Sequence, residues 1–263
     1  MRAARKLWWR AAAAAGAGGA LLTLTLSAGS VTPAKVTVRN AQLSGNWAGY
    51  IDGRQGVTSV AGQWTVPNAG SLPPGVSSTW VGIGGATTTD LIQAGTQEAS
   101  TPLDSFLAGG AYGAWIEMLP ANPVFISGCS TDPACTVRPG DVMKVSIIET
   151  GATTNVFTVL MNDVTRGWNY STQENYQSSN SSGEWIFESP SLAGVLPVPV
   201  GNSGKVMFAG ANGDALNGSG SFQPISAGGQ PVIALPIETA VSALGADGQS
   251  FNVCTYALSC PAP

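Results

Sequence analysis

The stretch Ser182-Gly183-Glu184-Trp185-Ile186-Phe187-Glu188 carries the alternation from which the fold is predicted. Successive side chains of a β-strand point to opposite faces, so Trp185 and Phe187 share one face. Glu184, Ile186 and Glu188 share the other. Two large aromatic side chains need burial, so the face of Trp185 is predicted to line the core. The two glutamates are then predicted to look outward, into solvent or a cleft.

Short runs of alternating or β-branched residues recur along the rest of the chain, separated by Gly, Pro, Asn and Asp. About a dozen strands are predicted in all. Examples are Thr58–Val66, Thr79–Ile83, Asp90–Thr96, Tyr112–Met118, Val142–Glu149, Asn155–Asn162, Gly183–Glu188, Lys205–Phe208 and Ser250–Tyr256. Outside the N-terminal segment, no window shows the sustained 3.6-residue apolar period of a helix. The sequence therefore predicts an all-β chain, folded as a sandwich or a barrel.

Two further polar side chains are predicted to face outward from their strands. Gln93 shares a face with Leu91 and Gly95, and Glu117 shares a face with Trp115. The alternation alone does not say whether Gln93, Glu117 and Glu184 meet. Four tryptophans are predicted to pack in the core or at its rim: Trp64, Trp115, Trp168 and Trp185.

Composition excludes several kinds of function. Histidine is absent from all 263 residues, which excludes Ser-His-Asp and Cys-His catalysis, His-ligated zinc and histidine pH switching. A chain trimmed near residue 30 carries 15 acidic and 7 basic side chains, a net charge of −8. Because phosphate contacts need clustered Lys and Arg, a nucleic-acid partner is not expected.

The N-terminal segment has the order of an export signal. A basic stretch over residues 1–10 precedes an apolar stretch over 11–26 and small residues at 27–30. This order is typical of a secretory signal, with a single membrane anchor as the alternative. We predict a signal peptide over 1–30, a short linker or pro-segment over 31–42, and one domain over 43–263. The protein is then secreted and monomeric, with no membrane contact after signal removal.

The cysteines agree with export. Cys129 and Cys135 are six positions apart, and so are Cys254 and Cys260. Four cysteines allow three pairings, among which the sequence alone does not decide. We predict the local pairs 129–135 and 254–260, because each closes one short loop. A metal site is the alternative, but no His supports it and neither spacing is CxxC.

The chemistry that remains lies in carboxylates, amides, hydroxyls and aromatic rings. In acidic surroundings a carboxylate suits the role of general base, since its ordinary pKa is about 4.3. A side-chain amide does not titrate and can donate to a developing oxyanion at any pH. The composition permits these roles without selecting among them.

Seven short motifs occur in order along the chain. They are Gly45–Tyr50 (GNWAGY), Gln63–Pro67 (QWTVP), Trp80–Gly85 (WVGIGG), Leu91–Thr96 (LIQAGT), Ala114–Pro120 (AWIEMLP), Pro139–Asp141 (PGD) and Ser182–Glu188 (SGEWIFE). Each is weak alone, but together they resemble the glutamic peptidase family (eqolisins, peptidase family G1), in its prokaryote-like subgroup. The resemblance extends over most of the chain after the signal.

The resemblance implies a fold and a mechanism. The fold is a sandwich of two large antiparallel sheets with the architecture of concanavalin A-like lectins and glucanases, and a polypeptide substrate lies across one concave sheet. Gln93 and Glu184 match the family's catalytic pair. Glutamate acts as general base on a water that attacks the scissile amide, and glutamine stabilises the oxyanion. No cofactor or metal is implied.

Four further residues match supporting positions of the family. Trp47 and Trp80 match tryptophans that line the cleft, Glu117 matches a glutamate on the neighbouring strand, and Glu188 matches an acidic residue close to the base. The chain also departs from the family pattern, because Gly84 and Gln97 stand where many fungal members have Asp. Glu98 is not expected to replace the second Asp, since it alternates to the opposite face.

Two other functions remain open at this stage. Glu117 and Glu184 could form the acid and base pair of a sandwich glycoside hydrolase. The chain could also be a secreted lectin-like module that binds peptide or glycan through its tryptophans without catalysis. Convergence of Gln93 and Glu184 would distinguish a peptidase from both.

Overall fold

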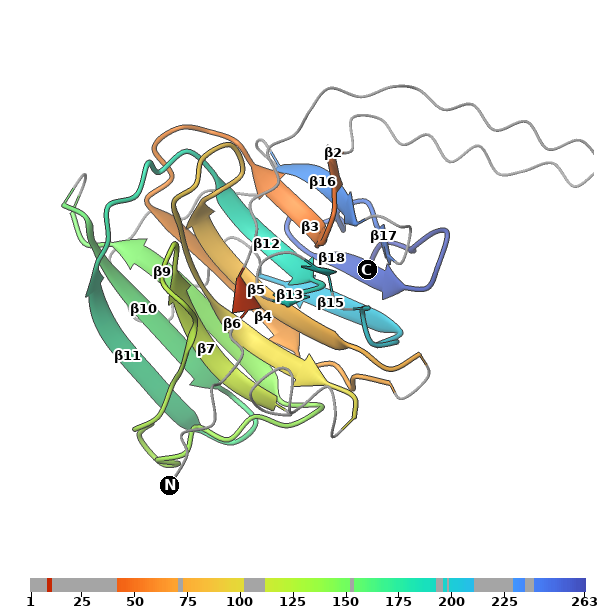
Figure 1. Cartoon of the computed structure of the whole chain (residues 1–263), viewed down its shortest axis with the longest axis horizontal. Helices are drawn as coiled ribbons and strands as arrows, with labels where there is room; N and C mark the ends of the chain where they lie inside the picture. Colours follow the sequence, from red (N-terminus) through yellow and green to blue (C-terminus); the bar gives the residue numbers. More distant parts are fainter. Residues whose placement is uncertain are drawn as a thin grey trace, which may run out of the picture.

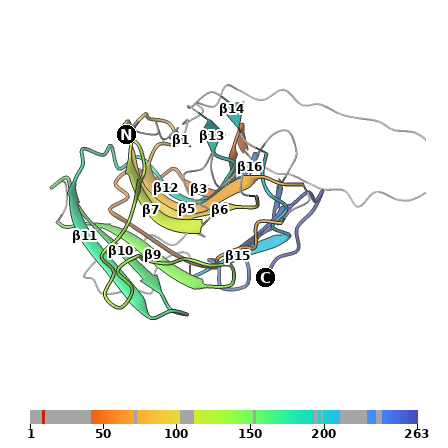
Figure 2. The ribbon, with the colours of Figure 1, turned by 60° about the horizontal axis from the view of Figure 1, so that its bottom comes forward.

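The computed structural model describes residues 9–10, 42–70, 73–101, 112–151, 154–192, 196–197, 199–210, 229–234 and 239–263. The described ranges contain strands, turns and loops but no helix, and thus no helical segment able to cross a membrane. Two large sheets stack face to face as the layers of a sandwich (Figures 1 and 2). The predicted all-β sandwich is therefore confirmed.

The first layer is an eight-stranded sheet. Its strands, in spatial order, are β2 (Gln42–Ser44), β16 (Gly229–Ala234), β3 (Trp47–Asp52), β12 (Gly183–Glu188), β5 (Val76–Gly84), β6 (Leu91–Ala99), β7 (Tyr112–Met118) and β8 (Val124–Phe125). All neighbours are antiparallel except β2 and β16, which run parallel. Strand β12 thus lies between β3 and β5, far from both in sequence.

The second layer is a seven-stranded sheet. Its spatial order is β11 (Trp168–Asn175), β10 (Val156–Asp163), β9 (Val142–Glu149), β4 (Ser59–Thr65), β15 (Lys205–Ala209), β18 (Phe251–Thr255) and β17 (Thr239–Val241). A small third sheet joins β1 (Trp9–Arg10), β13 (Ser191–Leu192) and β14 (Leu196–Pro197). In Figure 2, β13 and β14 lie on the side of the eight-stranded sheet that faces away from the second layer.

The core lies between the two layers. Trp185 and Phe187 of β12 are buried in it, as the alternation predicts. The indole nitrogen of Trp185 donates to the carbonyl oxygen of Ala61 at 2.8 Å, so a polar group of the core is satisfied by the opposite sheet. Trp64 and Trp168 also belong to this cluster, which confirms their predicted packing.

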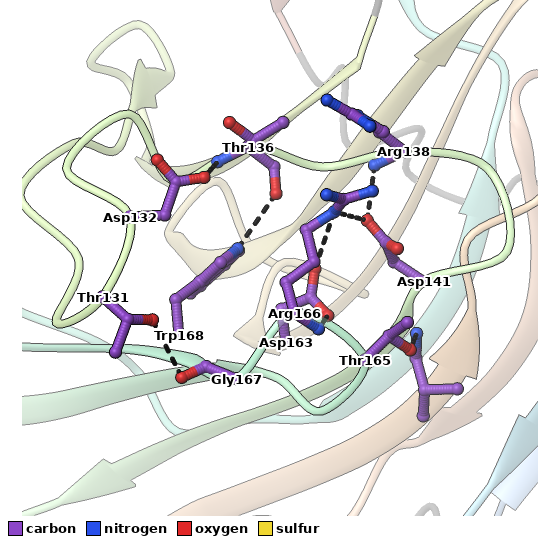
Figure 3. A network of polar contacts seen from close by, with 11 residues as sticks. Thr131, Asp132, Thr136, Arg138, Asp141, Asp163, Thr165, Arg166, Gly167 and Trp168 are labelled. Carbon is purple, nitrogen blue, oxygen red and sulfur yellow. Dashed lines mark hydrogen bonds and ion pairs between the residues drawn. The ribbon is translucent and has the colours of Figure 1, made fainter.

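Two disulfides close the loops that the spacing predicts, Cys129–Cys135 and Cys254–Cys260. Figure 3 shows how the segment around the first disulfide is attached to the turn between β10 and β11. Thr131 Oγ1 donates to the carbonyl oxygen of Gly167 at 3.0 Å, and the indole nitrogen of Trp168 donates to that of Thr136 at 2.9 Å. Arg166 Nε donates to Asp141 Oδ2 at 2.6 Å. These contacts fix a long loop without secondary structure against the edge of the second layer.

The predicted segment boundaries are only partly within the described ranges. The signal over 1–30 and the linker over 31–42 lie outside them, apart from residues 9–10 and Gln42. Strand β2 begins at Gln42, one residue before the boundary expected for the domain.

Candidate active site

Four neighbouring strands bring the predicted site residues into one row. Glu184 of β12 pairs with Gly82 of β5, which pairs with Gln93 of β6, which pairs with Glu117 of β7. Directly paired residues of adjacent strands project from the same face of a sheet. Glu184, Gln93 and Glu117 therefore share the face that looks away from the sandwich core. The sheet thus brings together three residues that are far apart in the sequence.

Gly82 leaves a gap in this row between Glu184 and Gln93. Strands lie about 4.8 Å apart, so two strand spacings separate these two backbones by roughly 9–10 Å. A Cβ at position 82 would come within 2.9 Å of Leu91 Cδ1 and 3.0 Å of Trp80 Cζ3. The space directly above Gly82 is therefore closely bordered by Leu91 and Trp80, and a side chain at position 82 would have to displace them.

Glu184 is completely buried. Neither of its carboxylate oxygens has a hydrogen bond of normal geometry within the described residues. Burial raises the pKa of Glu184 well above its ordinary value, with a smaller opposing contribution from Ser182, and the charges of Asp90 and Asp52 act in the same direction as burial. Such a carboxyl is a strong base once it is ionised.

Gln93 is bound to Glu117 rather than to Glu184. Nitrogen Nε2 of Gln93 lies 2.6 Å from Glu117 Oε2, while Gln93 Oε1 and Glu117 Oε1 are buried without a partner. Burial raises the pKa of Glu117 to about 8, and the charge of Glu188 adds to the effect. Gln93 lies between Glu117 and Glu184. If these two carboxyls were the acid and base of a glycoside hydrolase, an amide side chain would separate them.

A second polar group lies on the same face, two rows along β12. Glu188 accepts hydrogen bonds from Asn46 Nδ2 at 2.7 Å and from Trp80 Nε1 at 2.8 Å. Burial nonetheless raises the pKa of Glu188 to about 8. The rings of Trp47 and Trp80 pack edge to face, with centroids 5.1 Å apart. Both tryptophans lie on the predicted face, but they are almost fully buried and form its floor.

An open pocket with about 340 Å³ of empty space adjoins this floor. Its lining residues are Ser78, Gln97, Trp115, Glu117, Pro123, Phe125, Glu188 and Pro190. Trp115 packs in the buried hydrophobic cluster of this face, as its predicted core or rim packing requires, and it also lines this pocket. The alternation did place Trp115 on the face of Glu117, and that signal could have identified it. Asn46, Ser78 and Phe125 are lining or supporting residues that the sequence did not point to.

Gly84, one of the two positions at which the chain departs from the family pattern, has a clear local explanation. Gly84 has φ +88°, and a Cβ there would lie 2.8 Å from both the carbonyl oxygen and Oδ2 of Asp90. A carboxylate is therefore present beside position 84, supplied by Asp90. Glu98 lies on the opposite face, as expected, and accepts hydrogen bonds from Thr96 and Ser77 inside the sandwich.

Solved structures of similar fold agree with this architecture. Scytalido-glutamic peptidase with a transition state analog inhibitor matches with a TM-score of 0.62 and 22% identity, covering 80% of this chain and 98% of that one. SCP-B, an eqolisin in complex with the tripeptide Ala-Ile-His, matches with a TM-score of 0.57 and 19% identity over the same shares. Aspergilloglutamic peptidase from Aspergillus niger matches with a TM-score of 0.51 and 22% identity, covering 68% of this chain and 98% of that one. These likenesses show the fold.

Family membership comes from the sequence itself. A comparison with curated proteins gives no significant match. The model of the peptidase A4 family matches residues 45–244, which include the whole row from Gly82 to Glu184. The chain therefore belongs to the peptidase A4 family, the eqolisins of family G1, and is a glutamic-type endopeptidase.

Proposed function

We propose that this chain is a secreted acid endopeptidase that cleaves peptide bonds with Glu184 as general base and Gln93 as oxyanion donor. The observation that carries the proposal is the row across β12, β5 and β6, in which Glu184 and Gln93 project from the same face on either side of Gly82. The buried carboxylate oxygens of Glu184 have no hydrogen bond of normal geometry within the described chain, so their hydrogen-bonding capacity is unused there.

The reaction follows from these two groups. Ionised Glu184 takes a proton from a water molecule, whose oxygen attacks the carbonyl carbon of the scissile peptide bond. An N–H of Gln93 donates to the negative oxygen of the tetrahedral intermediate. Protonated Glu184 then passes its proton to the nitrogen of the leaving amine as the C–N bond breaks. The water is consumed, and Glu184 returns to its ionised form.

A pH below about 8 suits the neighbours of this pair, but the pH must still be high enough to ionise Glu184, because burial raises the pKa of that base. With pKa values of about 8, Glu117 and Glu188 are neutral in acid. A negative charge that forms on Glu184 or on the oxyanion then meets no charged carboxylate from either of them. The two disulfides and the export-type N-terminal sequence support an extracellular location.

The proposal is tested by hydrolysis of a denatured protein between pH 2 and 7. We expect cleavage in acid that pepstatin and chelators leave intact. Glu184→Gln should lower kcat by about 10²–10⁴-fold, since it removes the base. Gln93→Ala should lower kcat by about 10²–10³-fold, since it removes an oxyanion donor.

Glu98→Gln is the matched control, because Glu98 is an equally buried carboxyl on the other face of β6. The activity of the Glu98→Gln variant should equal that of the unsubstituted chain. Cleavage that survives both site substitutions in folded protein would show that the pair is not the catalytic site. A folded, unsubstituted chain without activity at any pH would instead indicate a binding module.

A further inference from the structure

The row of site residues contains more hydrogen-bond acceptors than donors. Four of its oxygens are buried without a partner: both of Glu184, Oε1 of Gln93 and Oε1 of Glu117. The only donor in the row is the amide nitrogen of Gln93, and it lies against Glu117 Oε2. Buried acceptors that lack donors are costly, so at least one of these carboxyls must carry a proton unless water supplies the missing hydrogens.

Glu117 is the carboxyl that touches the amide of Gln93. One end of the amide lies 2.6 Å from Glu117 Oε2, while the amide oxygen of Gln93 has no donor. A neutral carboxyl can donate its O–H to an amide oxygen, whereas an ionised carboxyl can only accept. The two ends of a glutamine amide have nearly the same shape, and the hydrogen-bond network decides which end points where. The contact is therefore best satisfied by a protonated carboxyl against the amide oxygen.

We propose that Glu117 is a positioning residue: in its protonated form it donates its O–H to Oε1 of Gln93 and so turns both amide N–H groups of Gln93 toward the gap over Gly82. The inference rests on the proposed function and deepens it. When Glu117 loses its proton to solvent, it becomes a pure acceptor and binds Nε2 of Gln93. The amide oxygen then faces the gap and repels an oxyanion.

The surroundings of Glu117 favour the protonated form. Burial is the main cause that raises its pKa to about 8. The titratable groups that face it are Glu188 from β12, which adds to this rise, and Tyr176 beyond β11, whose own pKa is raised to about 12 by burial. Glu184 lies further along the same row. Within the described residues, no Lys or Arg forms an ion pair with Glu117 that would favour its ionised form.

Activity profiles against pH give the first test, with Glu117→Gln, Glu117→Ala and Glu98→Gln as variants. Gln at 117 donates an N–H at every pH, so its kcat in acid should stay within a few-fold of the unsubstituted chain. The fall of kcat toward neutral pH should move to higher pH. Ala at position 117 has no group that fixes the orientation of the Gln93 amide. We therefore expect kcat to fall by about 10²-fold at all pH values while KM changes little.

Glu98→Gln is the control for changing a buried carboxyl on β6, and its pH profile should coincide with that of the unsubstituted chain. The inference would be overturned if, in folded Glu117→Gln protein, the fall of kcat toward neutral pH occurred at the same pH as in the unsubstituted chain. Equal damage from Gln and Ala at position 117 would do the same.

A second readout does not depend on activity. In protein carrying Glu184→Gln, which prevents self-digestion, the side-chain ¹⁵N amide signal of Gln93 should shift with pH along the titration of Glu117. The shift should vanish when Glu117→Gln is added. A Gln93 signal that does not change with pH would overturn the inference even in an active enzyme. If the Gln93 signal titrates but the unsubstituted chain shows no peptidase activity, only the proposed function is contradicted.

Discussion

Asp90 places a negative charge beside position 84, where the backbone conformation excludes a side chain. Burial would raise the pKa of Asp90, but the backbone N–H of Ser179, at 2.6 Å, and nearby hydroxyls lower it below its ordinary value overall. Asp90 therefore stays ionised in acid, and its charge contributes to the raised pKa of Glu184. In this chain Asp90 is a candidate for tuning the general base.

Asp90→Asn should lower the pKa of Glu184, because it removes a like charge while Asn can still accept from Ser179. The acid limb of the kcat profile should then move to lower pH. The control is Asp247→Asn in the loop before β18, an exposed Asp whose pKa is likewise lowered by local hydrogen bonds. An acid limb that moves equally in both variants, or in neither, would contradict a specific effect of Asp90.

Single residues were predictable from the sequence where one strand sufficed to place them. The alternation assigns Trp185 to the core and Glu184 to the opposite face, and both faces are confirmed, but Glu184 is fully buried there and does not look into solvent. The carboxylate of Asp90 beside position 84 was not predictable, and neither was the pocket beside Trp115, although alternation placed Trp115 on the face of Glu117. Both depend on which strands are neighbours and in what register, and alternation within one strand carries no information about either.

The glycines of β5 and β6 set the spacing of elements in the eight-stranded sheet. At Gly95, a Cβ would lie 2.2 Å from the carbonyl oxygen of Thr79 and 2.7 Å from Trp80 Cα. At Gly82, the closest atoms are the ends of the side chains of Leu91 and Trp80. The first contact is with backbone, which cannot move without separating the strands. The second is with side chains that can shift.

Gly95→Ala and Gly82→Ala should therefore differ in kind. Gly95→Ala should lower Tm strongly or prevent folding, because β5 and β6 are forced apart. Gly82→Ala should fold with a modest loss of Tm, but kcat should fall by about 10- to 100-fold, because a methyl group enters the gap between Glu184 and Gln93. Thermal unfolding and steady-state kinetics on the two variants separate these effects. Full activity in Gly82→Ala would argue against a reaction in this gap.

At the scale of elements, most strands followed from the sequence, but some did not. Strand β11 was missed because its inward positions are mostly polar or half-buried, with Trp168 the only fully buried side chain. Strand β3 is buried at every position, so it lacks the alternation of a half-exposed strand. The insertion of β12 between β3 and β5 follows from pairing across more than a hundred residues, which no local pattern encodes.

For the whole molecule, the buried carboxyls link stability to pH. The folded pKa values of Glu117 and Glu188 are about 8, above the ordinary value of 4.5, and burial also raises those of Glu98 and Glu184. The folded state thus binds more protons than the unfolded state between these values. This contribution to stability is complete below pH 4.5 and is lost as the pH rises through 8.

Tm should accordingly be highest in acid and fall between about pH 4.5 and 8, in contrast to the usual maximum between about pH 5 and 8. Calorimetry from pH 3 to 8 measures this directly. Glu98→Gln should flatten the curve, since it removes one buried titrating group and leaves the catalytic row unchanged. A Tm that rises toward neutral pH would contradict the assignment of protonated carboxyls to the folded state.

The position of β12 has a consequence for the nascent chain during synthesis. Glu184 can join the row only after residues 183–188 have been synthesised and inserted between β3 and β5, which pair with it on either side. A nascent or partly translocated chain that ends before this point holds Gln93 and Glu117 but no base. In the proposed mechanism, peptidase activity can therefore arise only after residues 183–188 have emerged, and a shorter nascent chain is not expected to digest itself.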